Sequence, residues 1–171
     1  KTLDDLEKIF GKKVVSIIDG LTKVTDVVDQ TTSLQAENFR KVLLTLSEDV
    51  RVILLKIADR LHNMRTLDAM PRDKQLKIAS ETIYLYAPIA HRLGFYAIKS
   101  EMEDLAMKIT EPEIYSDLES KLEKTKAVRN RFVSQFTLPI KKAIAEQSIK
   151  TDIYGRTKSI FSIWNKMRNK N

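Results

Sequence analysis

KIADRLHNMRTL, residues 56–67, repeats apolar and polar side chains with the period of an α-helix. At about 100° per residue, one face of that helix collects four apolar side chains: Ile53, Ile57, Leu61 and Met64. Within about 60° on the opposite face lie three polar side chains, which we call the polar stripe: Asp59, Asn63 and Thr66. We therefore predict a helix over residues 50–68 that buries one face in a core and exposes the other.

The polar stripe combines three short side chains that form helices poorly, so a functional role would explain their placement. A carboxylate such as that of Asp59 ligates a hard metal ion or orients a water molecule, and an amide or hydroxyl reads a base edge or a ribose. A solvated helix face shows the same residue types, and the pattern alone favours that simpler interpretation. His62 lies off the stripe and His91 lies near a predicted helix end, so we interpret both histidines as structural.

Apolar side chains at spacings of three and four recur along most of the chain and predict a mainly α-helical protein. Further helices are predicted over these ranges: residues 3–19, 34–46, 72–92, 95–109 and 113–147. Gly11 offers a break in the first of them, and Gly20 is expected to end it ahead of a loop over residues 22–33. Because proline kinks or splits a helix, we expect interruptions at Pro88 and Pro139.

The composition supports a helical, folded chain without cysteine chemistry. Its 171 residues are 43% hydrophobic and 31% charged, and four glycines and four prolines are too few for the turns of an all-β fold. The absence of cysteine excludes disulfides, thiolate metal sites and cysteine nucleophiles, and it makes a reducing, cytoplasmic location the expected one. No stretch approaches about 18 apolar residues, so no membrane span is predicted.

After Ser148 the pattern changes from helical to alternating. Residues 149–154 alternate apolar and polar side chains and predict a strand, Gly155 predicts a turn, and residues 156–170 predict an amphipathic helix. A helical body followed by strand, turn and helix indicates that a second domain, of the α/β type, begins near residue 148. One strand and one helix cannot bury a core, so only the start of that domain is expected here.

The end of the chain is basic. Residues 150–171 carry six basic side chains against the single acid Asp152, while the net charge of the whole chain is +7. Arg156 and Lys158 flank the first turn of the predicted helix, where free backbone N–H groups suit a polyphosphate, and Ser162 and Lys166 follow at a spacing of four. An ordinary basic surface helix has the same spacing, and the residues alone leave both interpretations open.

Three stretches of this sequence resemble the RelA/SpoT homologue family: Gln35–Lys41, Val52–Leu67 and Tyr86–Gly94. Gly155–Met167 resembles the opening of the synthetase domain of the same family, so the resemblance covers nearly the whole chain in order and spacing. It implies a partial helical hydrolase domain of the HD type, followed by the first strand and helix of an α/β nucleotidyltransferase-like synthetase domain. The implied boundaries are residues 1–110 for the hydrolase domain, 111–148 for a helical linker and 149–171 for the start of the synthetase.

The resemblance also implies two opposite activities in the bacterial stringent response. The hydrolase of the family removes pyrophosphate from the 3′ position of ppGpp or pppGpp with Mn²⁺. The synthetase transfers pyrophosphate from ATP to GDP or GTP, and the ligands of its Mg²⁺ are expected outside this chain. The parent protein is therefore expected to be an enzyme.

The resemblance assigns roles to residues of both motifs. Asp59 matches a ligand of the hydrolase metal, and three side chains match the site of the guanosine nucleotide: Asn63, Arg65 and Thr66. Four further residues match ATP-binding positions of the synthetase: Arg156, Lys158, Ser162 and Lys166. Arg156 would lie against adenine and the two lysines would hold phosphates.

Two departures from the family pattern bear on activity. The His-Asp metal motif of the family, with its Glu-Asp pair and the catalytic residues, is expected to precede Lys1, and no His-Asp pair occurs in this chain. Ser159 stands where a histidine is common, which is expected to weaken or alter the ATP site. We expect the 171 residues alone to be inactive in both directions.

The sequence also bears on two other classes of function. The chain could be a catalytically silent regulatory or interaction module, in which the helices of residues 113–147 transmit a signal. A nucleic-acid binder is disfavoured because aromatic side chains are few and do not interleave with the basic ones, so no direct DNA binding is expected. The ribosome or other regulators would act through other parts of the parent protein.

Overall fold

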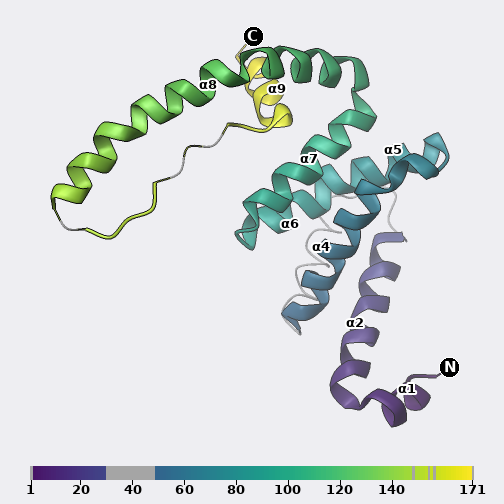
Figure 1. The fold of residues 1–171 in the computed structure, drawn as a ribbon. Helices are drawn as coiled ribbons and strands as arrows, with labels where there is room; N and C mark the ends of the chain where they lie inside the picture. The colour runs from purple at the N-terminus through teal and green to yellow at the C-terminus, as the bar shows by residue number, and fades with distance from the viewer. Residues whose placement is uncertain (1, 30–48, 148, 154, 156, 171) are drawn as a thin grey trace. The chain divides into compact units, whose positions relative to one another are not determined.

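The structure is a computed structural model that describes residues 2–29, 49–147, 149–153, 155 and 157–170 (Figure 1). All regular secondary structure in these residues is helical, as the sequence predicts for most of the chain. The chain divides into two compact units, Lys1–Ile109 and Thr110–Asn171. The helices of the first unit are α1 (Leu3–Phe10), α2 (Lys12–Asp29), α4 (Val50–Arg65), η1 (Leu67–Ala69), α5 (Arg72–Glu81), η2 (Thr82–Tyr86), α6 (Ala87–Arg92) and α7 (Tyr96–Thr110). The second unit contains α8 (Pro112–Glu146) and α9 (Ile160–Arg168).

Two glycines near the N-terminus have opposite effects on the helices. Gly11 has a φ of 78° and separates α1 from α2, which confirms the predicted break. The prediction that Gly20 ends the helix is wrong, because α2 continues to Asp29 through part of the predicted loop. A Cβ on Gly20 would lie 2.7 Å from a methyl carbon of Val52, so this glycine lets α2 approach α4 closely.

The helix that carries the polar stripe begins and ends close to the predicted bounds. The Asp49 carboxylate accepts a hydrogen bond from the backbone N–H of Arg51 and caps α4 at its N-terminus. The helix ends at Arg65, and a short 3₁₀ turn from Leu67 to Ala69 follows it. The predicted helix over residues 34–46, with the Gln35–Lys41 stretch, lies outside the described residues.

The helix is not split at Pro88, because α5, η2 and α6 follow one another without a gap, but the type of helix changes ahead of this proline. Between α5 and α6 the chain forms a π-helical segment, η2, in which the Ala87 N–H donates to the Thr82 carbonyl oxygen five residues earlier. Proline has no N–H, and its ring clashes with the carbonyl four residues before it, so a widened turn directly ahead of Pro88 accommodates the ring. Gly94, with a φ of 81°, follows the end of α6.

The core of the first unit lies between α4 and the helices that follow it. One cluster of buried side chains joins α4 to η2, α6 and α7: Val52, Ile53, Ile57, Leu61, Leu85, Tyr86, Ile89, Ala90 and Met102. A second cluster continues it toward the end of α4: Met64, Leu67, Ala79, Ala106 and Ile109. This core buries the apolar face of α4 and leaves its polar face outside the two clusters.

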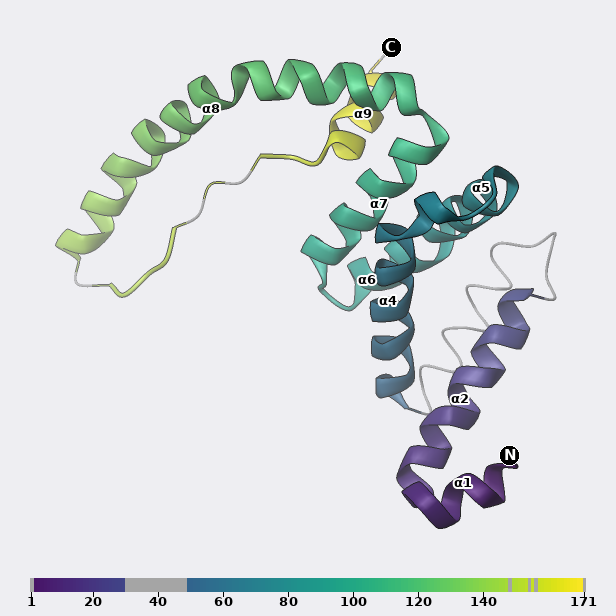
Figure 2. The same ribbon diagram turned by 45° about the vertical axis from the view of Figure 1, so that its right-hand side comes forward.

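The second unit differs from the prediction at three places. Pro139 lies inside α8 and does not divide it, and both views show α8 as one curved helix (Figures 1 and 2). Residues 149–153 form no strand, since a lone extended segment needs a neighbouring strand to satisfy its hydrogen bonds, and Tyr154 lies outside the described residues. Helix α9 begins at Ile160, later than the predicted residue 156.

No helix in the described part of the chain has the length and apolar character to cross a membrane.

Candidate functional site

The polar stripe lies on the exposed face of α4. Asp59, Asn63 and Thr66 are all exposed, while the four apolar side chains of the opposite face expose only 1–8% of their surface. The Asn63 side-chain amide donates a hydrogen bond of 3.5 Å to the Asp59 carboxylate, one helical turn away. The predicted two-faced helix is therefore confirmed, and the stripe presents a carboxylate beside an amide.

Thr66 is oriented by the end of the helix. Its hydroxyl donates to the His62 carbonyl oxygen at 3.1 Å, and its backbone N–H donates to the Asn63 carbonyl oxygen at 3.2 Å. Because the hydroxyl hydrogen is directed back into α4, the outward lone pairs of Oγ1 can accept a hydrogen bond. Thr66 thus presents an acceptor next to the amide of Asn63.

Arg65 contacts a residue that the sequence did not indicate. Its guanidinium forms a bidentate ion pair with Glu101 of α7, with Nε 2.6 Å from Oε1 and Nη2 2.9 Å from Oε2. These hydrogen bonds lower the pKa of Glu101, although both side chains are exposed and the pair adds little stability. Arg65 therefore links α4 to α7, and its predicted contact with the nucleotide stays a prediction.

Arg60 is a second arginine of α4 that sequence reasoning missed. It donates to Glu81 and to the Ile78 carbonyl oxygen, and its guanidinium lies 4.2 Å from the centre of the Tyr86 ring. The partners are 18 or more residues away in sequence, so only the tertiary fold brings them together.

The described residues do not by themselves form a metal centre. No group of three or more histidine, aspartate or glutamate side chains in the described ranges is arranged to hold a metal ion. Asp59 supplies one exposed carboxylate, which falls short of the six oxygen ligands that a hard divalent ion prefers. The Mn²⁺ site thus stays a prediction that needs ligands beyond these residues.

At the predicted ATP site, two serines form hydrogen bonds with each other and the two lysines are exposed. Ser159 caps α9: its hydroxyl oxygen accepts from the Ser162 N–H at 3.3 Å, and its O–H donates to the Ser162 hydroxyl at 2.8 Å. Lys158 is exposed just before the cap and Lys166 is exposed in the last turn, so they stand at opposite ends of α9. Arg156 lies outside the described residues.

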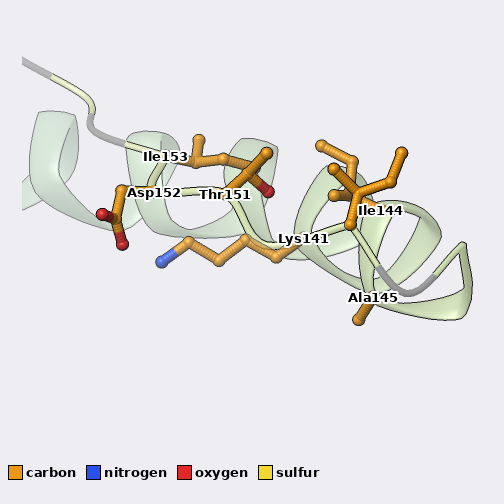
Figure 3. Close-up of a pocket in the computed structure, with 7 residues that line it drawn as sticks. Lys141, Ile144, Ala145, Thr151, Asp152 and Ile153 are labelled. Carbon is orange, nitrogen blue, oxygen red and sulfur yellow. The ribbon is translucent and has the colours of Figure 1, made fainter.

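A pocket of about 320 Å³ in the second unit lies beside the C-terminal part of α8 (Figure 3). It is lined by Lys141, Ile144, Ala145, Ile149, Thr151, Asp152 and Ile153. Figure 3 shows the amine of Lys141 extending toward Asp152 along an otherwise mostly aliphatic wall. One cation opposed by one anion does not suit a polyphosphate, and none of the predicted ATP-binding residues lines this pocket.

Residues 1–96, which include the whole of α4 and its polar stripe, match the model of the HD domain family. The chain belongs to the HD domain family. This match covers the predicted hydrolase region up to the start of α7 and confirms the HD-type fold expected from the sequence.

The relatives of this HD-domain chain confirm the resemblance to the RelA/SpoT homologue family. It is 41% identical over 172 aligned positions to a GTP pyrophosphokinase of Myxococcus xanthus, covering 98% of this chain and 23% of that protein. It is 38% identical over 170 positions to a guanosine-3′,5′-bis(diphosphate) 3′-pyrophosphohydrolase of Aquifex aeolicus (strain VF5), covering 99% and 24%. It is 37% identical over 167 positions to the bifunctional (p)ppGpp synthase/hydrolase SpoT of Escherichia coli (strain K12), covering 97% and 24%. The chain thus spans about a quarter of the length of these relatives.

Proposed function

We propose that this chain is part of a bifunctional enzyme of the stringent response that hydrolyses and synthesises (p)ppGpp. The observation that carries the proposal is the exposed polar stripe on α4, in a chain similar from end to end to proteins named as this hydrolase and as a GTP pyrophosphokinase. The absence of cysteine suits a cytoplasmic enzyme.

In the hydrolase reaction, water attacks the phosphorus atom that is bonded to the 3′-oxygen of the nucleotide. The bond between that oxygen and the phosphorus breaks, and GDP or GTP is released together with pyrophosphate. Asn63 and Thr66 would bind and orient the guanosine nucleotide through an amide and an acceptor oxygen, with Arg65 beside them. Asp59 would supply one ligand of Mn²⁺, the remaining ligands coming from outside the described residues.

In the synthetase reaction, pyrophosphate moves from ATP to the 3′-hydroxyl of GDP or GTP. Lys158 and Lys166 would hold ATP phosphates as point charges, and Arg156 would stack on adenine. Ser162, on α9, would contribute to the same ATP site. The Mg²⁺ of this reaction would be held by residues outside this chain.

A direct test uses the full reading frame that encodes this chain. The purified protein is incubated with ppGpp and Mn²⁺, and with ATP, GDP and Mg²⁺, while pyrophosphate, ppGpp and AMP are measured. The proposal expects Mn²⁺-dependent pyrophosphate release and ATP-dependent ppGpp formation. Absence of both activities in a folded protein would contradict it.

The second candidate is a catalytically silent helical module of the same architecture. It is favoured by the lack of a group of metal ligands within the described residues and by the exposed apolar side chains of α8, such as Val128, Phe132 and Phe136. The assay above separates the two, because a silent module would be inactive in both directions while still folding cooperatively.

Lys158→Ala is expected to lower ATP-dependent ppGpp synthesis by about 10- to 100-fold, because a charge-assisted contact to a phosphate contributes about 1.5–3 kcal/mol. Hydrolysis should be unchanged, since Lys158 belongs to the second unit. Lys170→Ala, at the exposed end of the same segment, serves as the matched control and should keep synthesis. An equal loss of both activities in Lys158→Ala would indicate a folding defect.

Asn63→Ala is expected to raise the KM for ppGpp in hydrolysis by about tenfold, because one hydrogen bond to the nucleotide contributes about 1.4 kcal/mol. Asn130→Ala, at an exposed asparagine of α8, is the control for the loss of an amide elsewhere. Steady-state rates over a range of ppGpp concentrations measure both. A KM unaffected by Asn63→Ala would remove that amide from the nucleotide site.

A further inference from the structure

Arg60 lies at the border between the buried face of α4 and the polar stripe, about 100° from Asp59 around the helix. Its side chain is only 12% exposed. Nη2 donates to Glu81 Oε2 at 3.0 Å, Nη1 donates to the Ile78 carbonyl oxygen at 3.4 Å, and the guanidinium carbon lies over the Tyr86 ring, 4.2 Å from its centre. One side chain thus contacts a carboxylate, a backbone carbonyl and an aromatic ring.

All three partners belong to the segment where α5 passes into the π-helical turn η2. Ile78 and Glu81 lie in the last turn of α5, and Tyr86 is the last residue of η2. Tyr86 is 4% exposed and belongs to the same core cluster as Ile57 and Leu61 of α4. Arg60 therefore ties the edge of α4 to a buried and irregular part of the fold, where such π turns are frequently associated with function.

We propose that Arg60 is a positioning residue, which fixes the rotation of α4 about its axis and thereby the direction of the polar stripe. The inference rests on the proposed function of the stripe and adds a residue to it. A helix is about 10–12 Å across with its side chains, so a rotation of about 10° moves a side-chain tip by about 1 Å. A misplacement of that size can lower a rate by about 100-fold.

Arginine suits this role better than lysine. Its planar guanidinium donates in two directions at once and stacks on a ring, whereas an ammonium is a single point charge. The contrast on the same helix is Arg51, which is 53% exposed and pairs with the N-cap residue Asp49. These hydrogen bonds of Arg51 join it to the N-cap of its own helix and not to another helix. Its replacement should therefore leave the polar stripe in place.

The first test reads the position of the stripe without any activity. The methyl group of Thr66 is observed by ¹³C-methyl NMR in the full reading frame, and its signal is assigned by its loss in Thr66→Ser. Arg60→Met, which keeps the aliphatic stem, and Arg60→Lys, which keeps the charge, are both expected to shift the Thr66 methyl signal. Arg51→Met is expected to leave it unchanged.

A matched pair at Tyr86 tests the stacking contact separately. Tyr86→Phe keeps the aromatic ring and should leave the Thr66 signal and hydrolysis at wild-type values. Tyr86→Leu removes the ring face and should change the Thr66 signal and the rate of hydrolysis in the same direction as Arg60→Met. The double variant Arg60→Met, Tyr86→Leu should differ little from Arg60→Met alone. A role in stability alone would lower the melting temperature without this pattern.

The second test is Mn²⁺-dependent ppGpp hydrolysis well below the melting temperature of each variant. Arg60→Met is expected to lose about 100-fold in rate, and Arg60→Lys is expected to recover only part of it. A folded Arg60→Met protein with the wild-type Thr66 signal and the wild-type rate would overturn the inference. If the wild-type protein does not hydrolyse ppGpp, the proposed function fails, and the Thr66 signal decides the positioning role by itself. If Arg60→Met does not fold, Arg60→Lys and Tyr86→Leu decide it by the same two readouts.

Discussion

Asp59→Ala is expected to abolish Mn²⁺-dependent release of pyrophosphate from ppGpp, with a loss of more than about 100-fold, while synthesis from ATP and GDP stays measurable. The side chain is exposed and is not among the buried residues of α4, so its removal should leave the fold intact. The loss would instead come from one missing carboxylate ligand and from the freed amide of Asn63.

The control for this variant is Asp73→Ala, which removes an exposed carboxylate from the first turn of α5. Its hydrolysis should equal that of the wild type. Asp59→Asn should require a higher Mn²⁺ concentration for half-maximal hydrolysis, because an amide is a weaker ligand than a carboxylate. Unchanged hydrolysis in Asp59→Ala would exclude Asp59 from the metal site, and a joint loss of synthesis would point to misfolding.

Ile57→Ala is expected to lower the free energy of unfolding by about 2–5 kcal/mol, because it leaves a cavity in a packed core. Ile57 is 2% exposed and lies in the cluster that joins α4 to η2, α6 and α7. Urea denaturation followed by circular dichroism measures the change. Since typical domains are stable by about 5–15 kcal/mol, this single variant would remove a large share of the stability of the unit.

Leu54→Ala is the matched control for Ile57→Ala, because Leu54 lies on the same helix and is 39% exposed. Its expected cost is under about 1 kcal/mol, since little buried surface is lost. Equal costs for the two substitutions would contradict the assignment of the buried face of α4.

The two faces of α4 could be predicted because a helical period is a local property of the sequence. Spacings of three and four place Ile53 and Ile57 on one side and Asp59 on the other, whatever the helix packs against. The bounds were close for the same reason, with the predicted residue 50 as the observed first residue of α4.

Glycine and proline were less predictable, because their effect depends on what surrounds them. Gly11 and Gly20 are the same residue type, but Gly11 has a positive φ while Gly20 packs against Val52 inside a helix. Pro88 is accommodated by a π turn and Pro139 by an uninterrupted, curved helix. The alternating pattern after Ser148 indicated a strand, yet a strand forms only where a neighbour supplies hydrogen bonds.

The candidate site was predictable only as far as one helix could show it. The stripe follows from the period, whereas the partners of the two arginines lie 21 residues away at Glu81 and 36 residues away at Glu101. No local pattern marks such pairs, because tertiary packing decides which carboxylate an arginine meets. The contacts of Arg60 with α5 and η2 could therefore be found only from the folded structure.

The π turn of η2 also makes the first unit sensitive to an insertion at this point. A π turn already holds one residue more than an α-helical turn, so a further residue inserted between Thr82 and Tyr86 would rotate everything after it by about 100°. Ile89 and Ala90, both fully buried, would then point away from the core. The number of residues in this segment therefore determines which side chains of α6 reach the core.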